Sequence, residues 1–213
     1  QALGPQGIDV SGQPNVNYTT VSGRITAVVP DMSDPTGSSY FVGTPNGGIW
    51  KTTNNGASWL PTTNNVTNAG VPIPVAVGSI SQAKLTGYIT SIVGNGSSDV
   101  VVTTTSHTGL ATGDRVTLQG VTGVIGVGNG VFGSAINSTF TITMTGANTF
   151  TLNNTASATY LGTDLTAKGQ FADNDKFVLY AGTGVGDRGL DSKAGVGVLK
   201  SVDGGFPWAL MGN

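Results

Sequence analysis

The nine residues KTTNNGASW at 51–59 return near the end of the chain as KSVDGGFPW at 200–208, although most of the sequence between them resembles neither copy. Each copy follows an alternating apolar stretch, carries Asn or Asp and then Gly at the same spacing, and ends on Trp. Such a phrase is typical of a tight turn between strands, because Asn, Asp and Gly tolerate the backbone angles that turns require. Its recurrence predicts an internal repeat that is interrupted by a long insertion.

Alternating apolar and polar residues run through almost the whole chain, and helical spacing is nearly absent. The alternating stretches are rich in Val, Ile, Thr, Phe and Tyr and are separated by Gly, Asn, Pro or Asp, as expected of strands and turns. The sequence therefore predicts an all-β fold, with SISQAKL at 79–85 as the best, short helical candidate. Strands are expected at 24–30, 39–43, 47–52, 72–80, 87–94, 99–105, 114–121, 138–145, 148–154, 176–182 and 195–201.

The repeat divides the chain. Its first copy, 23–61, is read as strand, Asp-Pro turn, strand, Gly-rich turn and strand, then the quoted phrase and a short fourth strand. Its second copy begins at 71–82, breaks off, and resumes at 171–212. The expected domains are an N-terminal extended segment at 1–22, a discontinuous pair of four-stranded units at 23–82 and 171–213, and an inserted module at 84–169.

The two phrases resemble the Asp-box (BNR) repeat of β-propellers, whose pattern is Ser/Thr-x-Asp-x-Gly-x-x-Trp. The first copy departs from it by carrying Asn54 for Asp, and the second has Pro207 before the Trp. The resemblance, to propellers of the sialidase or xyloglucanase type, implies two four-stranded propeller-type blades. It also implies a structural role, at the turn between the third and fourth strands of a blade, for Thr52, Asn54, Gly56, Trp59, Ser201, Asp203, Gly205 and Trp208.

The insertion has a different character. HTGLATGDRVTLQG at 107–120 and STFTITMTGANTFTL at 138–152 resemble a small β-barrel module of phage and bacterial surface proteins, related to the first catalytic-cysteine half-domain of ubiquitin-activating enzymes. The resemblance implies a small inserted β-barrel with a structural or spacing role. Because the chain has no cysteine, it implies no cysteine chemistry. His107, the single histidine of the chain, is expected to pack or to bond within a turn.

Composition excludes several functions. Charged residues make up 9% of the chain, the net charge is -2, and the pI is about 5.0. A nucleic-acid partner is therefore not expected, since such partners need a basic surface. No apolar run approaches the about 18 residues that span a bilayer, so no membrane span is expected. A surface whose polarity is mostly neutral suits an extracellular, cell-surface or virion protein.

No catalytic residue is assigned. A glycosidase needs two carboxylates across a cleft, and a sialidase-like site also needs several arginines, which this chain lacks as a constellation. One histidine and no cysteine leave no metal site and no expected cofactor. Weak Ca²⁺ binding by turn carboxylates is the alternative, at Asp31 and Asp34, Asp173 and Asp175, or Asp187 and Asp191.

Three aromatic residues could stack on sugar rings, and packing between blades is the favoured alternative. These candidates for ligand stacking are Trp50, Tyr40 and Tyr180.

A propeller closes with about 4 to 8 blades, whereas this chain supplies about two. Further blades are expected from a longer parent chain or from neighbouring subunits. The favoured function is a non-enzymatic extracellular or virion-surface structural and recognition protein, whose blades present a glycan- or protein-binding face. The alternative is a fragment of a secreted glycoside hydrolase, of the sialidase or xyloglucanase type, whose catalytic residues lie outside this chain.

Overall fold

The computed structural model describes residues 8–9, 12, 20–21, 23–68, 70–105, 109–122, 136–156, 161–164, 168–186 and 192–211, which are strands and connecting turns almost throughout. The all-β prediction is confirmed. The chain divides into two compact units. Unit 1 comprises Gln1–Ala83 and Val178–Asn213, and unit 2 comprises Lys84–Phe177.

Two long strands pass from one unit into the other, β9 (Val77–Asn95) and β15 (Lys168–Thr183). The helical candidate at 79–85 is wrong, because these residues lie within β9. A seven-residue segment has weak helical preference of its own, and pairing with neighbouring strands outweighs it.

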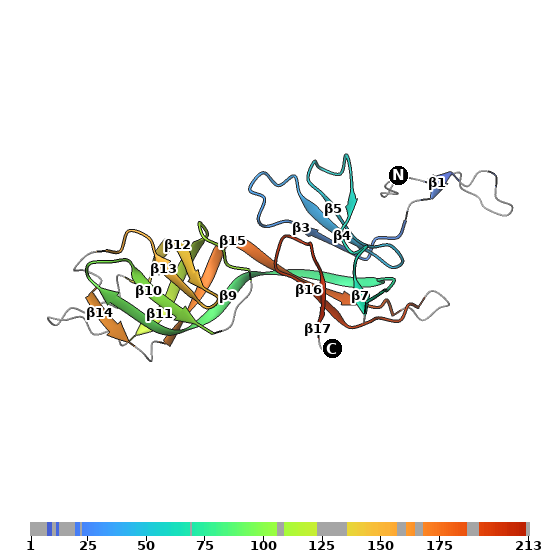
Figure 1. Ribbon diagram of the computed structural model, residues 1–213. Helices are drawn as coiled ribbons and strands as arrows, with labels where there is room; N and C mark the ends of the chain where they lie inside the picture. Colours follow the sequence, from blue (N-terminus) through green and yellow to red (C-terminus); the bar gives the residue numbers. More distant parts are fainter. Residues whose placement is uncertain are drawn as a thin grey trace. The chain divides into compact units, whose positions relative to one another are not determined.

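The first repeat is a four-stranded antiparallel sheet in chain order. Its strands are β3 (Ala27–Pro30), β4 (Tyr40–Thr44), β5 (Gly48–Thr52) and β6 (Leu60–Pro61). Figure 1 shows β3, β4 and β5 in blue to teal. The register pairs Phe41 with Lys51 and Val42 with Trp50, so alternate residues of each strand face opposite sides of this first sheet.

The second repeat is also built of four hydrogen-bonded neighbours. They are β9, β15, β16 (Val198–Ser201) and β17 (Ala209–Met211), which we call the second sheet and which end a larger nine-stranded sheet. Its first strand precedes the insertion and its second strand follows it. Gly184 N donates to the Ala76 carbonyl at 2.7 Å, which joins the two segments across the insertion.

Two further pairs of short strands belong to unit 1. One pair is β1 (Ile8–Asp9) with β2 (Thr20–Val21), inside the predicted N-terminal extended segment, and the other is β7 (Thr67–Asn68) with β8 (Val71–Pro72).

The first and second sheets share one core in unit 1. A side chain at Gly43 would place its Cβ 2.5 Å from Val77 Cγ1, so the sheets approach closely at this point. Burial of this apolar cluster supplies the main stabilisation of unit 1. The buried cluster consists of Phe41, Ile49, Val66, Val75, Val77, Leu179, Ala181, Leu199 and Trp208.

Unit 2 is a closed six-stranded barrel, and this confirms the small β-barrel that the resemblance implied. Its ring runs β9, β10 (Val100–Thr104), β13 (Thr149–Leu152), β12 (Thr139–Gly146), β11 (Arg115–Thr122) and β15, and β15 pairs with β9 to close it. β14 (Leu161–Asp164) pairs with the end of β9. Because the ring is closed, its strands leave no open edge.

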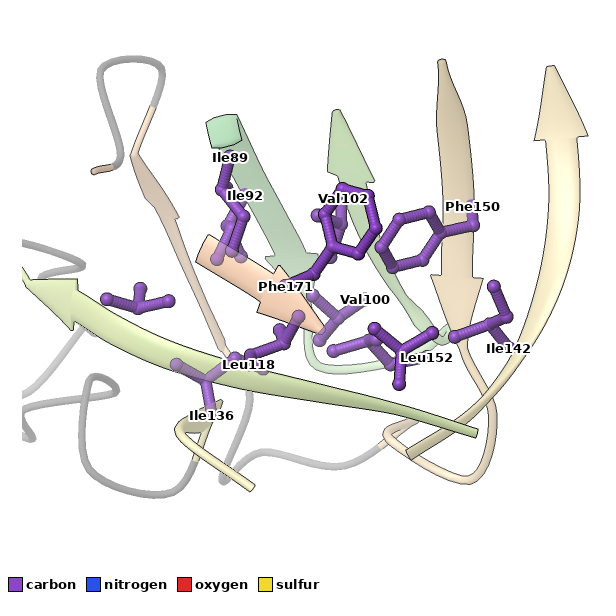
Figure 2. Packing of buried hydrophobic residues seen from close by; sticks show 12 residues of the cluster. Ile89, Ile92, Val100, Val102, Leu118, Ile136, Ile142, Phe150, Leu152 and Phe171 are labelled. Atoms are coloured by element: carbon purple, nitrogen blue, oxygen red, sulfur yellow. The ribbon is translucent and has the colours of Figure 1, made fainter. Parts of the chain in front are cut away.

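Side chains fill the barrel interior, as Figure 2 shows. Phe150 and Phe171 meet edge to face, with ring centroids 6.1 Å apart and an interplanar angle of 79°. The buried cluster is Ile89, Ile92, Val100, Val102, Val116, Leu118, Val121, Ile136, Ile142, Phe150, Leu152 and Phe171. Residues 171–177, assigned to the second repeat from sequence, thus lie in unit 2, because Phe171 packs in this core.

Candidate functional site: two equivalent turns

Two turns carry the repeated phrase, and we call residues 52–59 the first turn and residues 201–208 the second turn. Thr52 ends β5 and Ser201 ends β16, and both side chains are buried. Thr52 Oγ1 accepts a hydrogen bond from Gly56 N at 2.9 Å, and Ser201 Oγ accepts one from Gly205 N at 3.1 Å. In both repeats, therefore, an equivalent hydroxyl accepts a hydrogen bond from the backbone N–H four residues later.

A second bond is also common to both turns. Ala57 N donates to the Asn54 carbonyl at 3.1 Å, and Phe206 N donates to the Asp203 carbonyl at 3.3 Å. Asn54 in place of Asp preserves the first turn, because its Oδ1 accepts from Ser58 N at 2.9 Å. The two turns thus share their backbone bonds despite different residues at most positions.

The bond to the buried hydroxyl gives a testable expectation. Ser201→Ala and Thr52→Val should each lower the free energy of unfolding by about 1 to 3 kcal/mol, because each leaves the N–H of Gly205 or Gly56 without its partner. Urea unfolding measures the change. Thr53→Val, at the exposed next position, is the control and should change stability by less than about 0.5 kcal/mol. Equal effects at Thr52 and Thr53 would contradict the expectation.

The loop between the second and third strands repeats as well. Thr44 Oγ1 donates to the Gly48 carbonyl at 3.1 Å, and Thr183 Oγ1 donates to the Gly197 carbonyl at 2.6 Å. Sequence reasoning missed these two threonines as equivalent residues. The available signal was the Gly-Thr pair that ends the second strand in both copies.

The two tryptophans hold the same sequence position, just before the fourth strand, yet differ in burial. Trp208 is 7% exposed, and its Nε1 donates to Thr62 Oγ1 at 3.1 Å, in the first repeat. Trp59 is half-buried, and the Gly56 backbone lies against it. Trp208 thus joins the two repeats.

The second turn contacts Phe41 and Lys51 of the first sheet, and we call these two residues the seat. Lys51 Nζ donates to the Gly204 carbonyl at 3.1 Å and forms an ion pair with Asp31 Oδ2 at 2.8 Å. The same ammonium lies 4.8 Å from the centroid of the Phe41 ring. A Cβ at Gly205 would be 2.5 Å from Phe41 Cε1, so the turn reaches the ring only because this residue is glycine.

The carboxylates of Asp31 and Asp34 accept hydrogen bonds from residues close to them in the chain. Burial raises the pKa of Asp31, but hydrogen bonds from Lys51 and Ser33 outweigh it and hold that pKa below its ordinary value. Hydrogen bonds from Ser39 and Thr36 hold the pKa of Asp34 well below the ordinary range. Both groups are therefore ionised at neutral pH.

Asp173 is a buried carboxylate of unit 2. Its Oδ1 accepts from Asp175 N at 2.8 Å and Lys176 N at 3.1 Å, whereas its buried Oδ2 has no hydrogen-bond partner. Burial raises the pKa of Asp173, with a smaller contribution from the Asp114 charge. Asp114 itself pairs with Lys176 at 3.0 Å.

The raised pKa of Asp173 gives a pH prediction. The folded protein holds this proton more tightly than the unfolded chain, so stability falls as pH rises from the ordinary carboxyl value through the raised one. Relative to Asp173→Asn, which cannot titrate, the parent protein should lose stability toward neutral pH. Asp31→Asn is the control of opposite sign, because the pKa of Asp31 is lowered and its contribution is lost as pH falls. Urea unfolding at several pH values measures both, and parallel profiles for parent and Asp173→Asn would contradict the prediction.

Metal binding stays a prediction for these carboxylates. In the part of the chain that the structure describes, no three acidic, His or Cys residues gather as a metal site. Asp187, Asp191 and His107 lie outside the described residues.

The three predicted stacking residues do not form one platform. Tyr40 and Trp50 lie on the face of the first sheet opposite to Phe41, whereas Tyr180 is on the second sheet, paired with Lys200. Tyr40 Oη donates to the Gly37 carbonyl at 2.7 Å, and Trp50 Nε1 donates to the Gly47 carbonyl at 2.8 Å. The Tyr40 hydroxyl and the Trp50 indole N–H thus both bond to a carbonyl three residues earlier in the chain.

Two open hollows lie among the described residues. The larger, in unit 2, has a volume of about 590 Å³ and is lined by Tyr88, Ile89, Gln119, Gly120, Gly169 and Gln170. The smaller, in unit 1, has a volume of about 300 Å³ and is lined by residues 46–48, 63–64 and 72–75. Neither described lining contains an acid, a base or a histidine. Sequence reasoning did not select Tyr88, an exposed tyrosine in an alternating strand.

The fold and the turns define an all-β protein with a closed barrel and a four-stranded sheet. No protein-family model matches the chain, and no curated protein matches it. Among solved structures the chain is similar to "Phage phi92 endosialidase", with a TM-score of 0.28 and 11% sequence identity. The match covers 86% of this chain and 28% of that protein. Within the described residues, no helix has the length and apolar character to cross a membrane.

Proposed function

We propose that the chain is a non-enzymatic structural and recognition protein of an extracellular surface or a virion. Its two sheets act as propeller-type blades, and its barrel is a domain inserted into the second blade. The observation that carries the proposal is the shared bonding of the two turns, in which Thr52 and Ser201 close the same interval. These bonds use the polar groups of the repeated phrase for structure.

The surroundings of three carboxylates, Asp31, Asp114 and Asp173, support a non-enzymatic role. Asp31 is paired with Lys51, and Asp114 is paired with Lys176. Asp173 is fully buried. General acid–base chemistry needs such groups within reach of a substrate, and these ones are held by their partners or by the core. The proposal includes no cofactor and no nucleic acid.

The barrel hollow supports recognition of an uncharged glycan. Tyr88 is exposed, and it lines this hollow together with Gln119 and Gln170. An aromatic face can stack on a sugar ring, and planar amides can donate to and accept from its hydroxyls. The described lining of this hollow carries no charge that would select an acidic sugar.

A glycan array together with a panel of fluorogenic glycosides tests the proposal. The expected result is binding of uncharged glycans, weakened at least about tenfold by Tyr88→Ala, and no turnover of any glycoside. Phe206→Ala, at an exposed aromatic residue of unit 1, is the matched control and should leave glycan binding unchanged. Turnover of a glycoside by the unsubstituted protein would overturn the non-enzymatic role in favour of a glycoside hydrolase. Absence of glycan binding would overturn the recognition role of the barrel.

A further inference from the structure

One aromatic and lysine pair is built twice. Phe41 and Lys51 face each other across the second and third strands of the first sheet, and Tyr180 and Lys200 do so in the second sheet. Lys51 Nζ lies 4.8 Å from the Phe41 ring, and Lys200 Nζ lies 6.0 Å from the Tyr180 ring. Each lysine directly precedes the hydroxyl residue that closes its turn, Thr52 or Ser201. The two pairs are therefore equivalent positions of the repeat.

The first pair is occupied within the chain. Lys51 holds the Gly204 carbonyl, and the Gly205 backbone lies on the Phe41 ring. Phe41 is fully buried, and so is Ile49, two residues before Lys51 on the same face.

The second pair lies on a face where described residues of unit 1 are exposed. Val198, the equivalent of Ile49, is 43% exposed, whereas Ile49 is 0% exposed. Met211, the cross-strand partner of Val198, is 48% exposed. Val198 and Met211 therefore form an exposed apolar strip beside the Tyr180–Lys200 pair.

The first turn shows the complementary feature. Trp59 is half-buried, whereas the equivalent Trp208 is covered by the first repeat. Asn55, the equivalent of Gly204, is exposed and has a φ of 56°. One chain thus carries two exposed surfaces: the Tyr180–Lys200 pair with Val198 and Met211, and the first turn at residues 52–59. Two different surfaces that complement each other favour head-to-tail association of copies.

We propose that the Tyr180–Lys200 face binds the first turn of a second copy of this chain. In that contact Lys200 donates to the Asn55 carbonyl, as Lys51 does to Gly204. Gly56 lies on the Tyr180 ring, as Gly205 does on Phe41, because glycine has no Cβ to block the approach. The proposal depends on the proposed function only in treating the two sheets as copies of one repeat.

Site-specific cross-linking tests the head-to-tail contact, because the chain has no cysteine of its own. Purified Asn55→Cys and Lys200→Cys proteins are mixed and treated with a short bismaleimide. The expected result is a cross-linked dimer containing one chain of each kind. The matched control replaces Lys200→Cys with Ser97→Cys, an exposed position in the barrel, and should give no such dimer. Equal cross-linking to both partners would overturn the proposal.

Sedimentation measures the same association without cross-linking. The unsubstituted protein should self-associate as its concentration rises. Tyr180→Ala and Lys200→Glu should each weaken this association at least about tenfold. Tyr180→Phe should restore association, since the equivalent position in the first sheet is Phe41, and Ser97→Ala, at an exposed position in the barrel, is the control that leaves association unchanged. Unfolding curves establish that each variant is folded. A parent protein that stays monomeric at all concentrations would overturn the proposal, while its glycan binding and glycosidase assays would still report on the proposed function separately.

Discussion

Gly205→Ala is expected to destabilise unit 1 by about 3 to 5 kcal/mol, whereas Gly56→Ala, at the equivalent position, should cost only about 1 to 2 kcal/mol. Both glycines have positive φ, 93° and 85°, so both substitutions carry the cost of a left-handed side chain. At Gly205 the new Cβ also meets Phe41 Cε1 at 2.5 Å, and that ring is fully buried. At Gly56 the nearest atom is Trp59 Cζ2 at 3.5 Å, an ordinary contact.

Denaturant unfolding of the two variants measures the difference directly. Gly56→Ala is the matched control, because it has the same turn and the same backbone strain without the overlap. Equal losses of stability at the two positions would mean that the second turn does not rest on Phe41. A large loss at Gly205 alone would place the extra cost in the contact between the repeats.

Phe171→Ala is expected to lower the stability of unit 2 by about 3 to 5 kcal/mol, because it leaves a large cavity in the barrel core. Phe171 is fully buried and meets Phe150 edge to face at 6.1 Å. A Cβ at Gly87 would lie 2.4 Å from the Phe171 ring, which shows how closely β9 covers it.

Thermal and urea unfolding check this expectation, with the transition of unit 2 followed separately if the two units unfold in two steps. Phe206→Ala is the control, since Phe206 is 53% exposed and its loss should change stability by less than about 0.5 kcal/mol. Similar effects at Phe171 and Phe206 would contradict the core position of Phe171.

The all-β fold could be predicted because its signals are local, whereas the barrel was expected only from the resemblance of residues 107–120 and 138–152 to a known module. Alternation predicts which residues face a core, and Gly, Asn and Asp mark where strands end. The turn phrase was readable for the same reason, because the bond from Gly56 to Thr52 spans only four residues. The structural role of the phrase within a propeller stays a prediction.

Other features depended on partners distant in the chain. The segment at 79–85 is a strand because it belongs to β9, which pairs with β15, and residues 171–177 belong to the barrel because Phe171 packs there. Tyr40, Trp50 and Tyr180 are all aromatic, but sheet register places Tyr40 and Trp50 on one face of the first sheet and Tyr180 on the second sheet. Periodicity contains no information on which strands become neighbours.

The sequence by itself determined the strand-forming segments, the repeat and its turns, since each depends on residues a few positions apart. Only the tertiary structure decided that Lys51 holds the carbonyl of Gly204, 153 residues away, and that Trp208 is covered by the first repeat whereas Trp59 is not. The physical reason is that equivalent residues have equal local preferences. Their burial differs because packing depends on which surface folds against them.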